Sequence, residues 1–86
     1  MMNSDRIHTD YQPIACARYD QYEIAILHRQ RLRLVWEEGN VIYDQVVMPV
    51  NLRTAHGEEF LVLRLAGGEI REIRLDRIRR AEARSG

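Results

Sequence analysis

Tyr11-Gln12-Pro13-Ile14-Ala15-Cys16 is the stretch that decides how the chain begins its fold. A proline fixes its own φ angle and disfavours the α conformation in the residue before it, so this stretch should be an extended arm. From Cys16 or Ala17 to about Arg29 the chain contains no Gly or Pro, and apolar residues recur at helical spacing. We therefore expect a helix after the arm, with one apolar stripe made of Tyr19, Tyr22, Ala25 and Ile26.

The charges along this segment favour the same interpretation. Asp20 and Glu23 come early, whereas His28, Arg29 and Arg31 cluster at the end. Carboxylates are favourable near the positive N-terminus of a helix, and cations are favourable near its C-terminus. The order of charges therefore supports a helix in this register.

Five short segments after the helix have the composition of β-strands. In residues 31–37 the alternation places Leu32, Leu34 and Trp36 on one face, and further strands are predicted at 41–48, 59–66, 69–75 and 77–81. Residues 38–40 and 67–68 predict hairpin turns, residues 51–57 a turn or irregular connection, and Pro49 a strand end, edge or bulge. The sequence thus predicts a mainly β fold with one N-terminal helix, a small five-stranded antiparallel barrel capped by that helix.

The length of 86 residues is that of one small domain, without room for a separate catalytic lobe. We expect a flexible N-terminal tail at residues 1–10, a single domain at 11–81 and a frayed C-terminus at 82–86. A binding module is the default class for a chain of this size.

Composition excludes several kinds of partner and site. Thirteen basic residues, all arginines, balance thirteen acidic ones, so no net field recruits nucleic acid or an anionic membrane. A single cysteine excludes an intramolecular disulfide. The sequence shows no apolar signal region and no apolar stretch long enough to span a membrane, so we expect a cytoplasmic protein. His8, His28, His56 and Cys16 lack the spacing of metal ligands, and Cys16 has no neighbouring base, so we expect no metal, no cofactor, no catalytic residue and no enzyme.

Two motifs, taken in order, resemble the Rho-binding antiterminator family, also called Rof. The first is the opening stretch 11–16 with Tyr19, Asp20 and Glu23, and the second is 71–78, Arg-Glu-Ile-Arg-Leu-Asp-Arg-Ile, preceded by Glu-Phe-Leu-Val at 59–62. The resemblance covers about residues 11 to 79. It implies an Sm-like barrel preceded by a helix and a non-enzymatic protein that binds the transcription termination factor Rho. In the family, the protein occupies the N-terminal RNA-binding region of Rho, competes with RNA and inhibits Rho-dependent termination.

Carried over to this chain, the resemblance implies that Asp20 and Glu23 meet basic residues of Rho from one side of the helix, and that Tyr11 and Gln12 extend the contact from the arm. A purely structural role is the alternative. Asp20 and Glu23 would then only satisfy the helix terminus, and this stays open. For Tyr11 we favour packing of the arm onto the barrel.

The chain departs from the family pattern at Ala17 and Arg18, where a family member carries two acidic residues. An acidic patch could instead be built from other pairs, namely Glu37, Glu38, Glu58 and Glu59. Arg18 would oppose a basic surface on Rho if it lay on the contacting face.

The alternative function is an Sm-like RNA-binding module using the arginine-rich C-terminal strands, specifically Arg71, Arg74, Arg77 and Arg79. Acidic residues interleave with these arginines, so a salt-bridged strand face is the simpler interpretation, and we do not expect direct nucleic-acid binding. We expect a monomer, because Pro49 and charged strand faces discourage pairing between edges.

Overall fold

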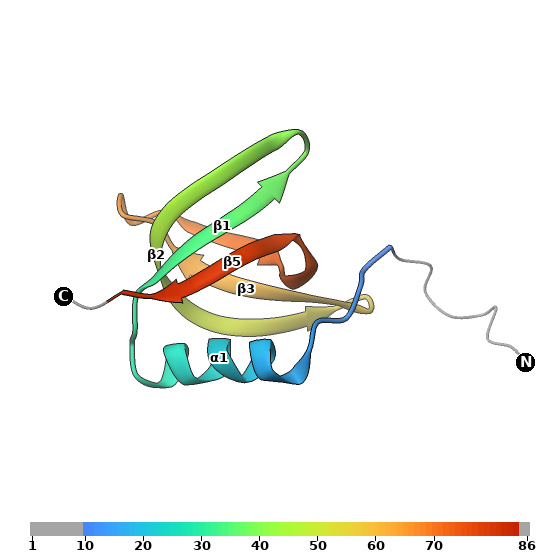
Figure 1. The fold of residues 1–86 in the computed structure, drawn as a ribbon, viewed down its shortest axis with the longest axis horizontal. Helices are drawn as coiled ribbons and strands as arrows, with labels where there is room; N and C mark the ends of the chain where they lie inside the picture. The colour runs from blue at the N-terminus through green and yellow to red at the C-terminus, as the bar shows by residue number, and fades with distance from the viewer. Residues whose placement is uncertain (1–9, 85–86) are drawn as a thin grey trace, which may run out of the picture.

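The computed structural model describes residues 10–84, which form one helix followed by antiparallel strands (Figure 1). The elements are α1 (Cys16–Leu27), β1 (Leu32–Glu38), β2 (Val41–Ala55), β3 (Glu58–Arg64), β4 (Ile70–Arg74), a 3-10 turn η1 (Leu75–Arg77) and β5 (Ile78–Ala83). The predicted class, mainly β with one N-terminal helix, is confirmed. Residues 1–9 of the predicted tail and residues 85–86 of the predicted frayed end lie outside the described part of the chain.

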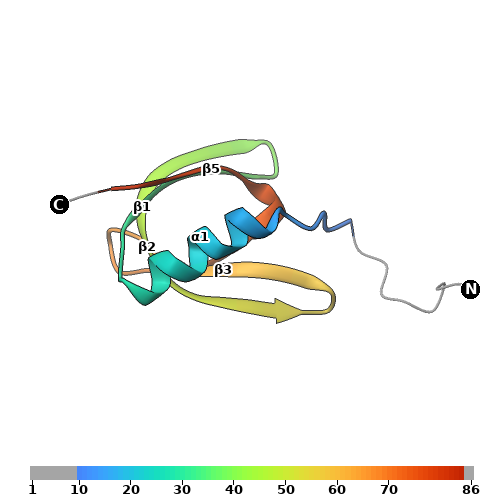
Figure 2. The same ribbon diagram turned by 60° about the horizontal axis from the view of Figure 1, so that its bottom comes forward.

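The strands form one curved sheet in the order β4-β3-β2-β1-β5, with every neighbouring pair antiparallel. Within residues 10–84, β4 does not pair with β5, so the predicted barrel is curved but not closed. Figure 2 shows α1 lying across the concave side, with β1 and β5 on one side of it and β3 on the other. The helix therefore covers the apolar interior that an open sheet would expose.

The helix begins where the extended arm ends, as the proline predicts. Ala15 is extended, with φ −63° and ψ 145°, and the helix ends at Leu27, slightly earlier than expected. Arg29 adopts a positive φ of 52°, and the N–H of Gln30 donates to the carbonyl of Ala25 at 2.8 Å, which satisfies a terminal carbonyl.

No helix among the described residues is both long and apolar enough to span a bilayer.

β2 joins the two halves of the sheet. Its first half pairs with β1 and its second half pairs with β3, and the register shifts between Pro49 and Asn51. Proline cannot donate a ladder hydrogen bond, so it is tolerated inside a sheet mainly at such irregularities. Of the three positions predicted for Pro49, a strand end, an edge or a bulge, the structure shows the last.

The prediction of a turn or irregular connection over residues 51–57 is wrong for most of that segment. Residues 51–55 continue β2 in register with β3, and only His56 and Gly57 form the turn, both at positive φ. The bulge redirects the strand without ending it. The polar composition that suggested a loop belongs to the solvent-facing side of a strand, because Asn51, Arg53 and Thr54 are exposed.

β5 also extends further than predicted. It runs to Ala83, which pairs with Leu32 of β1, and the N–H of Arg84 donates to the carbonyl of Arg31 at 2.9 Å. Strand pairing therefore continues past residue 81, where the sequence suggested the end of the domain.

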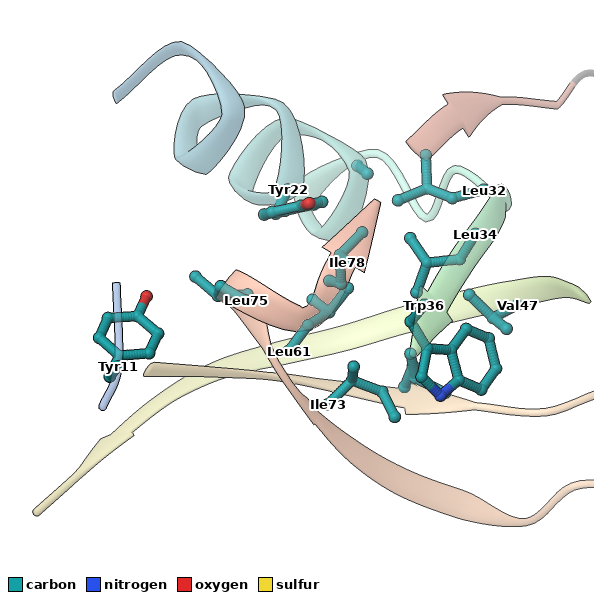
Figure 3. Packing of buried hydrophobic residues seen from close by; sticks show 12 residues of the cluster. Tyr11, Tyr22, Leu32, Leu34, Trp36, Val47, Leu61, Ile73, Leu75 and Ile78 are labelled. Carbon is teal, nitrogen blue, oxygen red and sulfur yellow. The ribbon is translucent and has the colours of Figure 1, made fainter. Parts of the chain in front are cut away.

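The core lies between α1 and the concave face of the sheet (Figure 3). The inward faces predicted from alternation are confirmed, since Leu32, Leu34 and Trp36 are all buried. Trp36 stacks on Tyr43, with ring centroids 5.1 Å apart. In Figure 3, Trp36 lies at the opposite end of the core from Tyr11. The buried side chains are Tyr11, Tyr22, Ala25, Leu32, Leu34, Trp36, Val47, Leu61, Leu63, Ile73, Leu75 and Ile78.

Candidate partner-binding surface

The N-terminal arm is held against the sheet by contacts from Tyr11 and Gln12. The Tyr11 hydroxyl donates to Oε1 of Glu59 at 3.0 Å, and the Arg74 guanidinium lies over the Tyr11 ring, 5.6 Å from its centroid. The backbone N–H of Gln12 donates to Oδ2 of Asp76 at 3.0 Å. Burial, followed by the bond to Glu59, raises the pKa of Tyr11. Both residues thus dock the arm, which is the packing role favoured for Tyr11.

Arg74 is the centre of this docking site. Its Nη2 lies 2.6 Å from Oδ2 of Asp76 and its Nη1 lies 2.8 Å from Oδ1 of Asp10, while Glu58 stands 3.6 Å away. The Asp76 side chain is only 9% exposed. Burial raises the pKa of Asp76, but the hydrogen bonds from Arg74 and from Gln12 N–H outweigh it and lower the pKa overall. Three carboxylates are therefore committed to one arginine within the fold.

A second set of carboxylates at the same end has no arginine partner within the described part of the chain, residues 10–84. Asp20 and Glu23 are exposed on α1, and Glu59 shares with Asp20 a hollow of about 250 Å³ that Ile14, Cys16 and Tyr19 also line. Burial raises the pKa of Tyr19, and the charges of Glu59 and Glu23 raise it further, so both carboxylates lie near its phenol. We call Asp20, Glu23 and Glu59 the acidic surface. None of the three is ion-paired within residues 10–84.

The other acids suggested by the sequence do not join this surface. Glu37 pairs with Arg79, Glu38 lies 3.7 Å from Arg71, and Glu58 belongs to the Arg74 site. Of the four acids named as a possible patch, Glu59 alone reaches the helix.

Arg18 does not face outward with the acidic surface. Its Nη2 donates to the carbonyl of Ile78 at 3.1 Å and to the Tyr22 hydroxyl at 3.4 Å. Its charge is thus turned toward β5 and the inner side of α1. The side-chain direction could not be read from sequence, because it depends on a carbonyl 60 residues away.

An apolar groove continues from the acidic surface along α1. Its volume is about 420 Å³, and it is lined by Ala17, Asp20, Gln21, Ile24, Ala25, His28, Gln30, Leu32 and Ala83. Ile24 is 57% exposed, and neighbouring Leu27 is 77% exposed. The sequence analysis did not select these two residues, although both fall outside the inward stripe at helical spacing and could have been found by that criterion.

The four arginines of the RNA-binding alternative each face a carboxylate. Arg74 and Arg79 pair closely with Asp76 and Glu37, whereas the pairs Arg71–Glu38 and Arg77–Asp10 are looser, each at 3.7 Å. The arginines are therefore salt-bridged as expected, but of their partners only Asp76 is one of the interleaved acids, and Asp10, Glu37 and Glu38 come from distant parts of the chain. Among the described residues, no group of three or more His, Cys, Asp or Glu side chains is placed to hold a metal ion.

Comparison with known proteins identifies the family. The family model described as modulator of Rho-dependent transcription termination (ROF) matches residues 13–85. The chain is 38% identical over 68 residues to Protein rof of Escherichia coli K12 and, equally, to Protein rof of Shigella flexneri, covering 79% of this chain and 76% of each relative. No solved structure gives a significant match. The chain therefore belongs to the ROF family of modulators of Rho-dependent transcription termination.

Proposed function

We propose that this protein binds Rho at the N-terminal RNA-binding region, through the acidic surface, and so competes with RNA and inhibits termination. The observation that carries the proposal is that Asp20, Glu23 and Glu59 stand together without ion pairs within residues 10–84. A surface that binds RNA phosphates is basic, and carboxylates can take the place of those phosphates. Complementary charge also speeds association and rejects other partners.

The apolar groove gives this contact a second component. Ile24 and Leu27 follow Asp20 and Glu23 on the outward side of the same helix, and their exposed area would be buried by a partner that covers the whole helix. Interfaces typically derive much of their affinity from a few such buried anchors, with charged groups at the rim. In this proposal the protein is a stoichiometric inhibitor, acts as a monomer and works in the cytoplasm.

Tyr11 and Gln12 contribute indirectly in this proposal. Both hold the arm against the sheet, and Tyr11 also holds Glu59, one of the three carboxylates of the acidic surface. Their role is to position the surface, with only the exposed side chain of Gln12 able to touch Rho itself.

The test is a competition experiment with purified Rho and a labelled pyrimidine-rich RNA, read by fluorescence anisotropy. The wild-type protein should displace the RNA. The Asp20→Arg/Glu23→Arg variant should need at least about 30-fold more protein for the same displacement, because two attractions become repulsions. Its melting temperature should stay close to that of wild type, since neither side chain makes an ion pair in the described fold.

Glu69→Arg is the control for a charge reversal far from the helix, one reversal where the double variant has two, because Glu69 is also exposed and lies at the far β3–β4 turn. It should displace RNA as wild type does. Failure of saturating wild-type protein to change RNA binding would overturn the proposal, and equal loss in Glu69→Arg would show that only overall charge matters.

A further inference from the structure

The outward side of α1 carries a row of exposed side chains. In Figure 1 the helix lies along the bottom of the molecule, and within residues 10–84 the sheet lies on one side of it only. The row has the three- and four-residue spacing of one helix face, on the side away from buried Tyr22. Ile24 and Leu27, at its centre, are each more than half exposed. We call this row the outer stripe, and its members are Ala17, Asp20, Ile24, Leu27 and His28.

The apolar groove beside the outer stripe is lined in part by small side chains. Ala17, Ala25 and Ala83 leave room where larger side chains would fill the space. Gln21 fixes the wall on β5, because its Nε2 donates to the carbonyl of Ala81 at 3.0 Å. The groove is therefore a preformed recess of about 420 Å³, and its size and lining suit an aliphatic side chain presented by a partner.

Charge changes sign along the outer stripe. Asp20, with Glu23 near it, precedes the apolar centre, whereas His28 and then Arg29 follow it. A second α1 laid antiparallel over the first brings its basic end onto these acids and keeps the two apolar centres together. A parallel copy would set like charges against each other, and antiparallel helices also align their dipoles favourably. The outer stripe is thus complementary to a copy of itself turned by a two-fold axis.

The charges of β5 beside the groove agree with this order. Arg84 follows β5 at the end where α1 stops, since the side-chain amide of Gln30 donates to the Arg84 carbonyl. Glu82 lies near the same end, but it pairs with Arg80, and both of these side chains are exposed on the strand surface. The end of the groove nearest the C-terminus of α1 is therefore basic in sum.

We propose that α1 docks antiparallel on α1 of a second copy of this chain, in a symmetric dimer in which each Ile24 side chain meets the apolar groove of the other copy. The contact uses one helix face per copy, so it is smaller than a standard interface and reversible. It covers Asp20, one of the three carboxylates of the acidic surface. Self-association and Rho binding therefore exclude each other, a consequence that rests on the proposed function, and the monomer is the form that binds Rho.

The test measures sedimentation of the full chain without Rho, from about 5 μM to about 500 μM protein. Wild type should shift from monomer toward dimer within this range. Ile24→Ser/Leu27→Ser should stay monomeric throughout, because the two apolar anchors are lost. At the lowest concentration its melting temperature should match that of wild type, since both side chains are exposed in the monomer.

Val41→Ser/Ile42→Ser is the matched control. Val41 and Ile42 are 51% and 58% exposed, as apolar as the centre of the outer stripe, but they lie at the start of β2, away from the helix. This variant should dimerise as wild type does. A wild type that stays monomeric to the highest concentration, or equal losses in the two serine doubles, would overturn the proposal.

A charge exchange tests the antiparallel arrangement. Asp20→Arg should weaken the dimer at least about 5-fold, because each new arginine faces the basic end of the other helix. Asp20→Arg/His28→Asp should recover most of that loss, since each new arginine then meets a new carboxylate. Without recovery, the antiparallel pairing is wrong.

Binding to Rho distinguishes this inference from the proposed function. At a concentration where wild type alone is dimeric, Rho should still take up at most one copy per Rho chain. Two copies per Rho chain would show that the dimer leaves the acidic surface open, and would overturn the mutual exclusion. Displacement of RNA by a protein that never dimerises contradicts the dimer alone, whereas a dimer that never displaces RNA contradicts the proposed function alone.

Discussion

Two sets of carboxylates lie at the same end of this molecule and differ in what surrounds them. Asp76 is almost covered, and Arg74 lies 2.6 Å from its Oδ2. Asp20 and Glu23, on the helix nearby, are exposed and have no ion pair within residues 10–84. The same functional group thus occurs in two settings at this end, one paired with Arg74 inside the fold and the other exposed, and the second is the one that we propose contacts a partner.

The difference implies that stability and binding separate at this end of the protein. Removing a covered, paired charge leaves its partner uncompensated, and this is costly. Removing an exposed, unpaired charge costs the fold little. A carboxylate whose replacement lowers both the stability of the fold and the binding of Rho would contradict this separation.

Replacing Asp76 with alanine is expected to have the largest effect on stability. Arg74 loses its closest carboxylate and the N–H of Gln12 loses its acceptor, so the free energy of unfolding should fall by about 3 kcal/mol. Urea denaturation followed by tryptophan fluorescence measures this, because Trp36 is buried in the core.

Asp44→Ala is the control for that experiment. Asp44 pairs with Arg33 at 2.7 Å, but both side chains are more than 40% exposed, so the unfolding midpoint should hardly move. A large loss in Asp44→Ala, or none in Asp76→Ala, would remove the distinction between the two kinds of carboxylate.

The contribution of Asp76 should also depend on pH. Its pKa in the folded protein lies below the ordinary value of 3.8, so the unfolded chain takes up the proton first as the pH falls. The stabilisation is complete above that ordinary value and is lost as the pH falls through the folded-state pKa. Wild type should therefore exceed Asp76→Asn by about 2 kcal/mol at about pH 6, and the gap should close toward about pH 2.

Urea denaturation of both proteins at several pH values checks this prediction. A gap that stays constant from neutral to acidic pH would mean that the Asp76 charge is not what stabilises the arm. Asp20→Asn should be about as stable as wild type at about pH 6, since its side chain is exposed and unpaired within the described residues.

Arg18→Gln should have a moderate effect and should act on the fold. The substitution weakens the hydrogen bond to the Ile78 carbonyl that ties α1 to β5, so the free energy of unfolding should fall by about 1.5 kcal/mol. Displacement of RNA from Rho should be unchanged when measured well below the melting temperature. A marked gain in affinity for Rho would instead show that the Arg18 charge opposes the partner.

Much of the fold was accessible from sequence because it rests on local patterns. The proline before the helix and the alternation of Leu32, Leu34 and Trp36 predicted the lead-in and one inward strand face, and both are confirmed. The length of β2 was not accessible, because a bulge at Pro49 lets the strand continue through polar residues that resemble a loop.

The candidate site could be predicted only in part from the sequence, because contacts between residues distant in sequence decide which carboxylates are paired and which are exposed. Asp10 and Gln12 reach Arg74 and Asp76 across 64 residues, and Arg18 reaches Ile78 across 60. Local sequence patterns do not connect residues so far apart. The sequence could therefore identify the carboxylates, but it could not predict which of them pair within the fold and which stay exposed. The exposure of Asp20 and Glu23 is consistent with the resemblance, and their contact with Rho stays a prediction.

Tyr11→Phe should have the smallest effect on stability. It tests the residue that contacts both sets of carboxylates, since Tyr11 lies against Arg74 and donates to Glu59 of the acidic surface. Phenylalanine keeps the buried ring and its contact with Arg74 but removes the hydroxyl that donates to Glu59, so the free energy of unfolding should fall by about 1 kcal/mol. Because the hydroxyl also positions Glu59, one of the three carboxylates of the acidic surface, affinity for Rho should fall only slightly. Thermal melting and the RNA competition assay measure the two effects on the same samples. A large loss of Rho binding without a loss of stability would mean that the Tyr11 hydroxyl itself contacts Rho. The arm would then form part of the binding surface as well as part of the fold.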